Sequence, residues 1–269
     1  MSIDHNLEDI KRSKQEASLV VETLGGFNVF VNGREITSKD WGRDKTVQLI
    51  QFFITARHRR GLHKEQIIDR LWEGSTMDEG MRDIKVALHG INKALQPDRK
   101  PREEPKFIIR QGVTYQLSEK EVWIDAEAFD QTLALLSLNS NENTENSRQI
   151  LRYATELYKG SYLPNRAFDD WTATERERLQ LLAINAMISL GELTLQTNPT
   201  ESIRLAQEAL IVDPTWEEAY RLQMTAYSMK KNRPQVIKTY KACTKVLDEE
   251  FGIAPLPETK RIYDQVMGI

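Results

Sequence analysis

Hydrophobic and polar positions divide the chain into two regions. Residues 19–36 form short runs of alternating apolar and polar positions, with glycine-containing turn pairs at 25–26 and 32–33. This pattern predicts a small antiparallel sheet. From Ile124 onward, apolar residues instead recur three and four positions apart, as in amphipathic helices. The sequence therefore predicts a mixed fold, with an N-terminal α+β region followed by an all-α region.

Three helices are expected between the sheet and residue 95. The first covers 46–57 and the second 64–72, and both carry one apolar face. A connector rich in Gly, Ser and acidic residues, 73–80, is expected to be a loop leading into the third helix, 78–95. The third helix should bury the stripe Ile84, Ala87, Leu88, Ile91 and Leu95. The second and third helices then form a helix-turn-helix.

Another face of the 78–95 helix is basic and carries an amide. At about 100° per residue, its polar side chains gather within an arc of roughly 100°; they are Arg82, Lys85, His89, Asn92 and Lys93. Arg and Lys can bind guanine edges or phosphates and Asn can bind adenine, so this face suits the major groove of DNA. The alternative interpretation is a helix face exposed only to solvent.

A hairpin is expected after this helix. Three prolines between residues 96 and 105 prevent the helix from continuing. Residues 107–117, FIIRQGVTYQL, form two short strand patterns about a glycine, with Arg110 near the tip. This hairpin would stand beside the 78–95 helix as a wing.

The sheet, the three helices and the terminal hairpin resemble the OmpR/PhoB-type winged helix over residues 19–118. The resemblance implies that 78–95 is the recognition helix and that Arg110 of the 107–118 wing reaches toward the minor groove. The 73–80 connector corresponds to a loop that contacts RNA polymerase in some members, which makes Glu73, Asp78 and Glu79 candidate polymerase contacts. The alternative interpretation of this segment is an acidic linker. Where many members have Arg-Leu-Arg late in the recognition helix, this chain has Gly-Ile-Asn at 90–92.

The all-α region contains an internal repeat. A shift of 34 residues aligns Ile188 with Leu222, Leu190 with Met224, Leu193 with Tyr227, Ile203 with Ile237 and Ala209 with Cys243. This is the period of tetratricopeptide helix pairs, which stack because one pair cannot bury its own apolar face. The segments YKGSYLPNRAFDDWTATERERLQLL, LIVDPTWEEAYRLQMTAYS and LDEEFGIAPLPETKRIYDQV, in this order, resemble the bacterial transcriptional activator domain.

The whole chain is similar to the Streptomyces antibiotic regulatory proteins, in which a winged helix precedes this helical domain. The resemblance implies a transcription activator that binds repeated promoter sites in double-stranded DNA as a homodimer and recruits RNA polymerase. The expected organisation is a mobile leader at 1–18, a winged-helix domain at 19–120 and a tetratricopeptide-like domain at 121–269. The boundary should fall near residues 118–125, so that the two halves separate.

Charge and composition agree with this division. The net charge of −3 combines −1 over residues 1–18, +3 over 19–124 and −5 over 125–269, and the basic half suits a polyanion. No apolar run reaches the roughly 18 residues of a membrane span and no signal peptide is evident, so a cytoplasmic protein is expected. The single cysteine, Cys243, is expected to be a small buried residue.

No pattern in the sequence predicts an enzyme. The four histidines, at positions 5, 58, 63 and 89, are scattered without metal-ligand spacing, and no nucleotide-binding or acyl-transfer motif occurs. No cofactor or metal is therefore expected. The alternating charges at 175–178 are interpreted as a solvated helix face. An alternative function remains, namely a protein-interaction adaptor whose winged helix no longer binds DNA, since the 90–92 departure removes two guanidinium groups.

Overall fold

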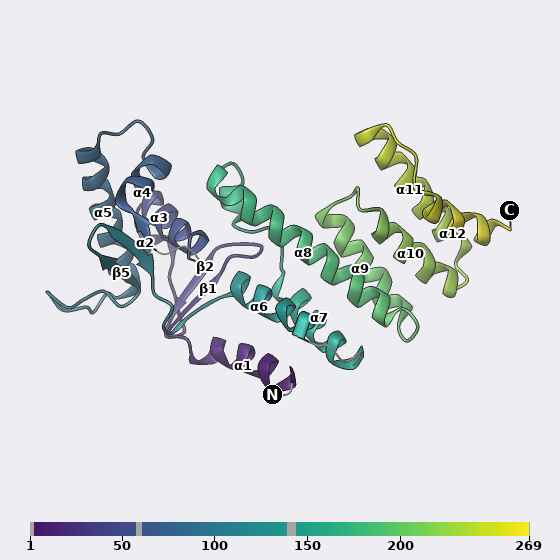
Figure 1. The fold of residues 1–269 in the computed structure, drawn as a ribbon, viewed down its shortest axis with the longest axis horizontal. Coiled ribbons are helices and arrows are strands. Elements are labelled where there is room, and N and C mark those ends of the chain that lie inside the picture. The colour runs from purple at the N-terminus through teal and green to yellow at the C-terminus, as the bar shows by residue number, and fades with distance from the viewer. Residues whose placement is uncertain (1–2, 58–60, 139–143, 269) are drawn as a thin grey trace. The chain divides into compact units, whose positions relative to one another are not determined.

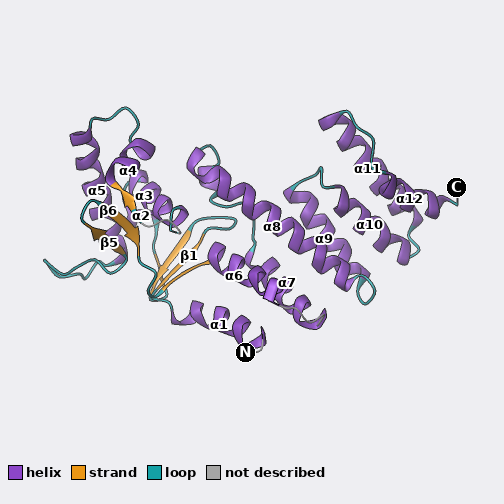
Figure 2. Ribbon diagram, viewed as in Figure 1, coloured by secondary structure: helices purple, strands orange, loops and turns teal. Residues whose placement is uncertain are grey.

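The structure is a computed structural model that describes residues 3–57, 61–138 and 144–268. His58 therefore lies outside the described residues. Contacts group the chain into two compact units. The first, here called the winged-helix unit, consists of residues 11–125 and 162–176, and the second, the helical unit, consists of residues 1–10, 126–161 and 177–269. Figures 1 and 2 show the elements of both units.

The winged-helix unit contains the predicted sheet with one additional strand. Strands β1 (Leu19–Glu22), β2 (Asn28–Val31) and β3 (Arg34–Glu35) are antiparallel, which confirms the prediction. A further strand, β7 (Val122–Ile124), follows the wing in the sequence and pairs in parallel with β1, giving the order β3-β2-β1-β7. Strand β7 was not predicted, because its three residues are too few to show an alternating pattern.

Helices α2 (Ser38–Trp41), α3 (Asp44–Thr55), α4 (Lys64–Leu71) and α5 (Met77–Leu95) follow the first three strands. The predicted 73–80 loop is shorter than expected because Thr76 caps α5. The Glu79 amide donates to Thr76 Oγ1 at 3.3 Å, while Glu79 Oε2 accepts from the Thr76 amide and hydroxyl at 3.0 and 2.7 Å. This reciprocal capping box stabilises a helix start at Met77.

The apolar stripe of α5 is buried as predicted, apart from Leu88, which is half-buried. Two glycines allow α5 to approach its neighbours closely. A β-carbon at Gly80 would lie 2.6 Å from Ile68 on α4, and one at Gly90 would lie 2.8 Å from Thr46 Oγ1 on α3. Both distances are shorter than van der Waals contact, so packing requires glycine at these positions.

The wing is present where the sequence placed it. Strands β5 (Ile108–Gln111) and β6 (Thr114–Leu117) form the hairpin, and β4 (Leu62–His63) completes a small sheet in the order β4-β6-β5. Gly112 lies at the turn with φ +61°, a left-handed conformation that glycine adopts without strain.

Residues 162–176, here called the strap, are separated in sequence from the rest of the winged-helix unit but pack within it. Tyr162 is buried, its hydroxyl lies 2.8 Å from Thr55 Oγ1, and it forms a β-bridge with Leu24. Arg166 donates to both carboxylate oxygens of Asp44, at 2.5 and 3.1 Å, and to Gln51 Oε1 at 2.8 Å. The strap therefore binds α3, the helix that precedes the helix-turn-helix of α4 and α5.

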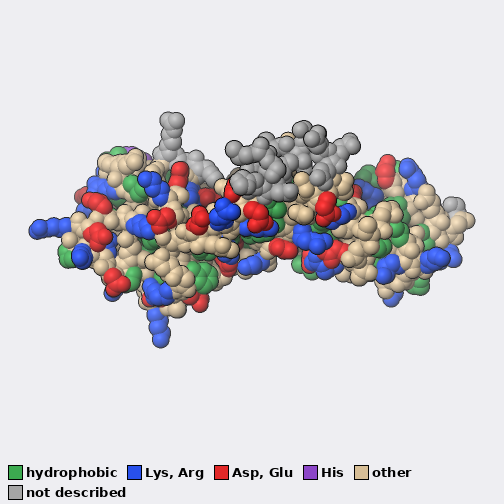
Figure 3. All heavy atoms as spheres, turned by 90° about the horizontal axis from the view of Figure 1, so that it is seen from below, with side chains coloured by type: hydrophobic (Ala, Val, Ile, Leu, Met, Phe, Trp, Pro, Cys, Tyr) green, Lys and Arg blue, Asp and Glu red, His purple; other side chains and the backbone are tan. Residues whose placement is uncertain are grey.

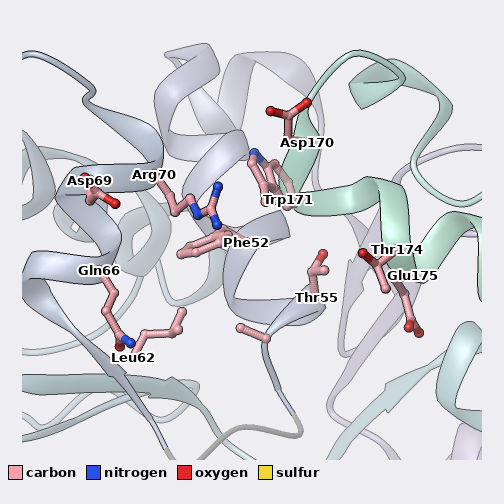
Figure 4. Close-up of a pocket in the computed structure, with 11 residues that line it drawn as sticks. Phe52, Thr55, Leu62, Gln66, Asp69, Arg70, Asp170, Trp171, Thr174 and Glu175 are labelled. Carbon is pink, nitrogen blue, oxygen red and sulfur yellow. The ribbon is translucent and has the colours of Figure 1, made fainter.

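A hollow of about 420 Å³ lies between the strap, α3 and α4 (Figure 4). The Phe52 and Trp171 rings meet edge to face, with centroids 5.5 Å apart, and form its apolar wall. Asp69, Arg70 and Asp170 bring charged groups to its rim. Trp171 thus packs against Phe52 of α3.

The structure corrects the interpretation of 175–178 as a solvated face. Arg176, in the strap, donates to the Tyr162 carbonyl at 3.2 Å and to the Arg166 carbonyl at 2.7 Å, so it fastens the turn before α8. Arg178, in the helical unit, pairs with both carboxylate oxygens of Asp130 at 2.8 and 2.5 Å. Alternating charge did not reveal these structural roles, because the partners are distant in sequence.

The helical unit begins with part of α1 (Ile3–Glu16), in a region where only a mobile leader was expected. Leu7 is 4% exposed and packs with Leu135 of α6 (Asp125–Leu138) and Ile150 of α7 (Thr144–Leu157). Few apolar residues in 1–18 are available for burial, so the helical stripe was too short to be recognised in the sequence.

The remaining helices confirm the predicted helical array: α8 (Asp170–Thr194), α9 (Pro199–Val212), α10 (Glu217–Met229), α11 (Arg233–Phe251) and α12 (Pro257–Met267). Residues related by 34 positions have similar burial, as Leu190 and Met224 are 1% and 0% exposed. A β-carbon at Gly191 would come within 2.4 Å of Leu222, so α8 and α10 approach closely. Cys243 is fully buried, as predicted, and burial raises the pKa of its thiol to about 12.

Candidate nucleic-acid interface

Helix α5 presents the predicted basic face to solvent. Arg82, Lys85, His89 and Lys93 are exposed, while Asn92 is half-buried. Within the described residues, none of these five side chains makes a hydrogen bond or an ion pair with the protein. Basic groups that are not neutralised internally can bind an external anion without first breaking a protein contact.

Val86 also lies on this face and was missed by the sequence analysis. Its side chain is 50% exposed between basic residues. A β-branched residue at a position where the helical pattern calls for a polar one is the signal that could have identified it. An apolar side chain on this face can contact the methyl group of thymine, which polar side chains do not recognise well.

Arg110 is held in place on the wing. Its Nε donates to the Gly112 carbonyl at 2.9 Å, and its guanidinium carbon lies 5.7 Å from the centre of the Tyr115 ring. In the described part of the chain, its two terminal nitrogens have no acceptor. The wing therefore fixes the side chain while leaving most of its donors for a ligand.

The recognition helix and the wing meet around a hollow of about 340 Å³. It is lined by four of the six residues predicted to bind DNA, which are Lys85, His89, Asn92 and Arg110. Arg99, which was not predicted as a site residue, adds another cation, and Glu104 is the acidic residue among those that line the hollow. Arg82 and Lys93 lie on α5 outside it. Basic side chains therefore outnumber acidic ones among the residues that line this hollow, which also include the apolar residues Met81, Leu88 and Ile108.

The three candidate polymerase contacts have different surroundings. Glu73 and Asp78 are exposed. Glu79 is also exposed, but its carboxylate accepts the Thr76 hydrogen bonds, which hold its pKa below the ordinary value. Glu79 thus has a structural role at the start of α5, which leaves Glu73 and Asp78 as the more available carboxylates.

The surface of the winged-helix unit in Figure 3 shows Lys and Arg side chains projecting into solvent, with acidic side chains between them. The unit is therefore only moderately basic overall, in keeping with the +3 net charge of residues 19–124. The candidate interface differs from the rest of the unit in the cations that gather between α5 and the wing, and not in net charge.

A winged helix followed by stacked helix pairs is the architecture of a transcription regulator. Residues 124–267, more than half of the chain, match the family model described as the bacterial transcriptional activator domain. The chain belongs to this family, and its architecture is that of the Streptomyces antibiotic regulatory protein-like activators.

The fold is similar to that of a solved structure, "Mycobacterium tuberculosis EmbR in complex with low affinity phosphopeptide". The TM-score is 0.74 at 16% sequence identity, and the match covers 94% of this chain and 66% of that one. The chain thus spans somewhat less than two thirds of the length of this structural relative. No match to a curated protein was significant.

Within residues 3–57, 61–138 and 144–268, no helix is both long and apolar enough to cross a membrane. No group of three or more His, Cys, Asp or Glu side chains in the same residues could hold a metal ion.

Proposed function

We propose that this protein is a sequence-specific DNA-binding transcription activator that inserts α5 into the major groove and places the β5–β6 wing near the minor groove. One observation carries the proposal: Lys85, His89, Asn92 and Arg110, from two separate elements, line one recess. Among the described residues, the first three side chains make no hydrogen bond or ion pair there, and the two terminal nitrogens of Arg110 have no acceptor. Cationic side chains from a helix and a wing that line the same recess can contact a DNA backbone that runs along the protein surface.

The contacts divide into two kinds. Arg82 and Asn92 can address base edges, while Lys93 and the recess between α5 and the wing can address phosphates. Arg110 is held close to the wing turn, from which it can extend toward the minor groove. In this proposal the protein acts as a homodimer on repeated promoter sites and recruits RNA polymerase, and membership of an activator family supports the second feature.

The close packing of Gly90 against Thr46 favours DNA binding over the adaptor function. Gly90 is required where α5 packs on Thr46, so the missing arginine at this position has a packing cause and is not evidence that DNA binding was lost. The adaptor function would leave the solvent-facing basic residues of α5 and the wing without a role.

Binding to a duplex of its own upstream region, measured at several salt concentrations, tests the proposal. Each phosphate neutralised contributes about −0.9 to the slope of log affinity against log salt, so several contacts should give a slope of a few negative units. The absence of duplex binding even at low ionic strength would refute the proposed function.

A further inference from the structure

The hollow between the strap, α3 and α4, here called the strap hollow, has an apolar wall. Phe52, Ala56 and Leu62 are buried, and the Trp171 ring meets the Phe52 ring edge to face. The volume of about 420 Å³ lies near the lower end of the roughly 300–1,000 Å³ that small-molecule sites occupy. The strap hollow can therefore hold the apolar part of a small ligand.

A cation without a protein partner faces this wall. Figure 4 shows the Arg70 guanidinium turned from α4 toward the Phe52 and Trp171 rings. Within the described residues, the Arg70 side chain makes no hydrogen bond or ion pair. A guanidinium carries paired N–H donors that match the two oxygens of a carboxylate. Arg70 can therefore hold a carboxylate group beside the apolar wall.

Acidic side chains also line the strap hollow. In the described part of the chain, its other charged residues are Asp69, Asp170 and Glu175. Glu175 turns away from the two rings in Figure 4 and already interacts within the protein. Asp69 and Asp170 are exposed, and among the described residues their carboxylates make no hydrogen bond or ion pair. These two carboxylates can accept hydrogen bonds from an ammonium group.

Charges of both signs at the strap hollow select the class of ligand. A ligand with only an anionic group would lie close to two carboxylates that nothing neutralises, and one with only a cationic group would lie close to Arg70. An α-amino acid carries both groups, a carboxylate that suits Arg70 and an ammonium that suits Asp69 or Asp170. Its side chain must be apolar or aromatic to match Phe52 and Trp171.

We propose that the strap hollow binds a free α-amino acid with an apolar or aromatic side chain. The ligand contacts the strap, α3 and α4 together, so its binding stabilises the packing of the strap within the winged-helix unit. The residues that line the strap hollow and those that line the recess between α5 and the wing do not overlap. The inference therefore goes beyond the proposed function and does not depend on it.

Isothermal titration calorimetry on the full chain tests the ligand class. The probes are L-phenylalanine, hydrocinnamate, which lacks the ammonium group, and phenethylamine, which lacks the carboxylate. L-Phenylalanine should bind saturably, and each of the other two about tenfold more weakly or less, because each loses a charge-assisted hydrogen bond. The inference is overturned if L-phenylalanine, L-leucine and L-tryptophan all fail to bind. It is also overturned if hydrocinnamate or phenethylamine binds as tightly as L-phenylalanine.

Two variants test the position of the site. Arg70→Met should lower the affinity for L-phenylalanine about tenfold or more and leave that for phenethylamine unchanged. Asp69→Asn with Asp170→Asn should weaken L-phenylalanine binding without weakening hydrocinnamate binding. Arg43→Met is the matched control, since Arg43 is an exposed arginine of the same unit outside the strap hollow, and it should bind as the parent does.

The substituted side chains are exposed, so the variants should fold, and thermal melts followed by circular dichroism verify this. Parent-like affinity of folded Arg70→Met for L-phenylalanine would contradict the assignment of the carboxylate to Arg70 and overturn the inference. DNA is absent from these titrations, so a negative result leaves the proposed function intact. The gel shift tests that function separately.

Discussion

Packing of α5 against α3 determines that position 90 is occupied by glycine. An added β-carbon would lie 2.8 Å from Thr46 Oγ1 and 2.9 Å from Thr46 Cγ2, and Thr46 is itself buried. The sequence showed only a low helix propensity and a missing arginine at this position. The cause could not be predicted, because the close approach of α5 to α3 depends on tertiary packing.

Gly90→Ala should therefore destabilise the winged-helix unit. Overpacking costs about 1–3 kcal/mol, and the gain in helix propensity returns about 1 kcal/mol, so a net loss of roughly 1 kcal/mol is expected. Val86→Ala is a control on the exposed side of α5 and should not destabilise the unit. Adding Thr46→Ala to Gly90→Ala removes both clashing atoms. Urea unfolding measures the free energy of unfolding of the two single variants and of the double variant. If the double variant is no more stable than Gly90→Ala, the packing explanation is contradicted.

Two basic residues on α5 should make different contributions to DNA recognition. Arg82→Ala, if Arg82 contacts a base edge, should cost roughly 1–3 kcal/mol on the preferred site and much less on random DNA. Lys93→Ala, nearer the end of the helix, should weaken binding to both alike if Lys93 contacts phosphate. Selection from a randomised duplex library with each variant measures the difference. Equal losses on all sequences for both variants would show that base recognition lies elsewhere.

Among the elements, those with long periodic patterns were predictable from the sequence. Helices α3 to α5 and the β5–β6 wing lie close to their predicted ranges, and α6 to α12 fall in the region predicted to be all-α, because apolar residues recur at helical spacing in these segments. Strand β7 and helix α1 were missed, since their burial depends on distant partners. The basic face of α5 was predictable for the same local reason, and so was the exposed position of Val86 on it, whereas the position of Arg99 required the folded chain.

The strap is the element that no local pattern could assign to the winged-helix unit. Its contacts join residues more than 100 positions apart, such as Arg166 with Gln51 and Tyr162 with Thr55. The sequence places these residues in the helical region, where their apolar and charged side chains are equally consistent with a turn between helices.

Arg166→Ala should loosen α3. The substitution removes hydrogen bonds to Asp44 and leaves the Oε1 acceptor of Gln51, a fully buried residue, without its arginine donor, which costs about 1–3 kcal/mol. Arg204→Ala is a control that removes two exposed ion pairs, to Glu201 and Glu208, and should cost about 1 kcal/mol or less. Hydrogen exchange of α3 amides should accelerate only in the Arg166 variant. Unchanged exchange would show that the strap does not stabilise the helix.

At the scale of the whole molecule, the two units should differ in their relation to DNA. The net charge of −5 over residues 125–269 repels phosphate, while the recess between α5 and the wing attracts it. DNA binding should therefore reside in the winged-helix unit. Dimer contacts from the helical domain should raise the effective concentration of the second winged-helix unit at the neighbouring repeat.

A comparison of fragments tests this division of labour. Residues 11–125 should bind a single site, but more weakly than the full chain binds two repeats, and residues 125–269 alone should fold as a helical unit without measurable DNA affinity.

Because the strap packs within the winged-helix unit, a peptide covering 162–176 should raise the melting temperature of the 11–125 fragment, and the same peptide with Arg166→Ala should raise it less. Gel shifts on one-repeat and two-repeat duplexes, with and without the peptide, measure both effects. If the strap-supplemented fragment equals the full chain on two repeats, the helical domain adds nothing to assembly on DNA, and its contribution would then be confined to the polymerase contact.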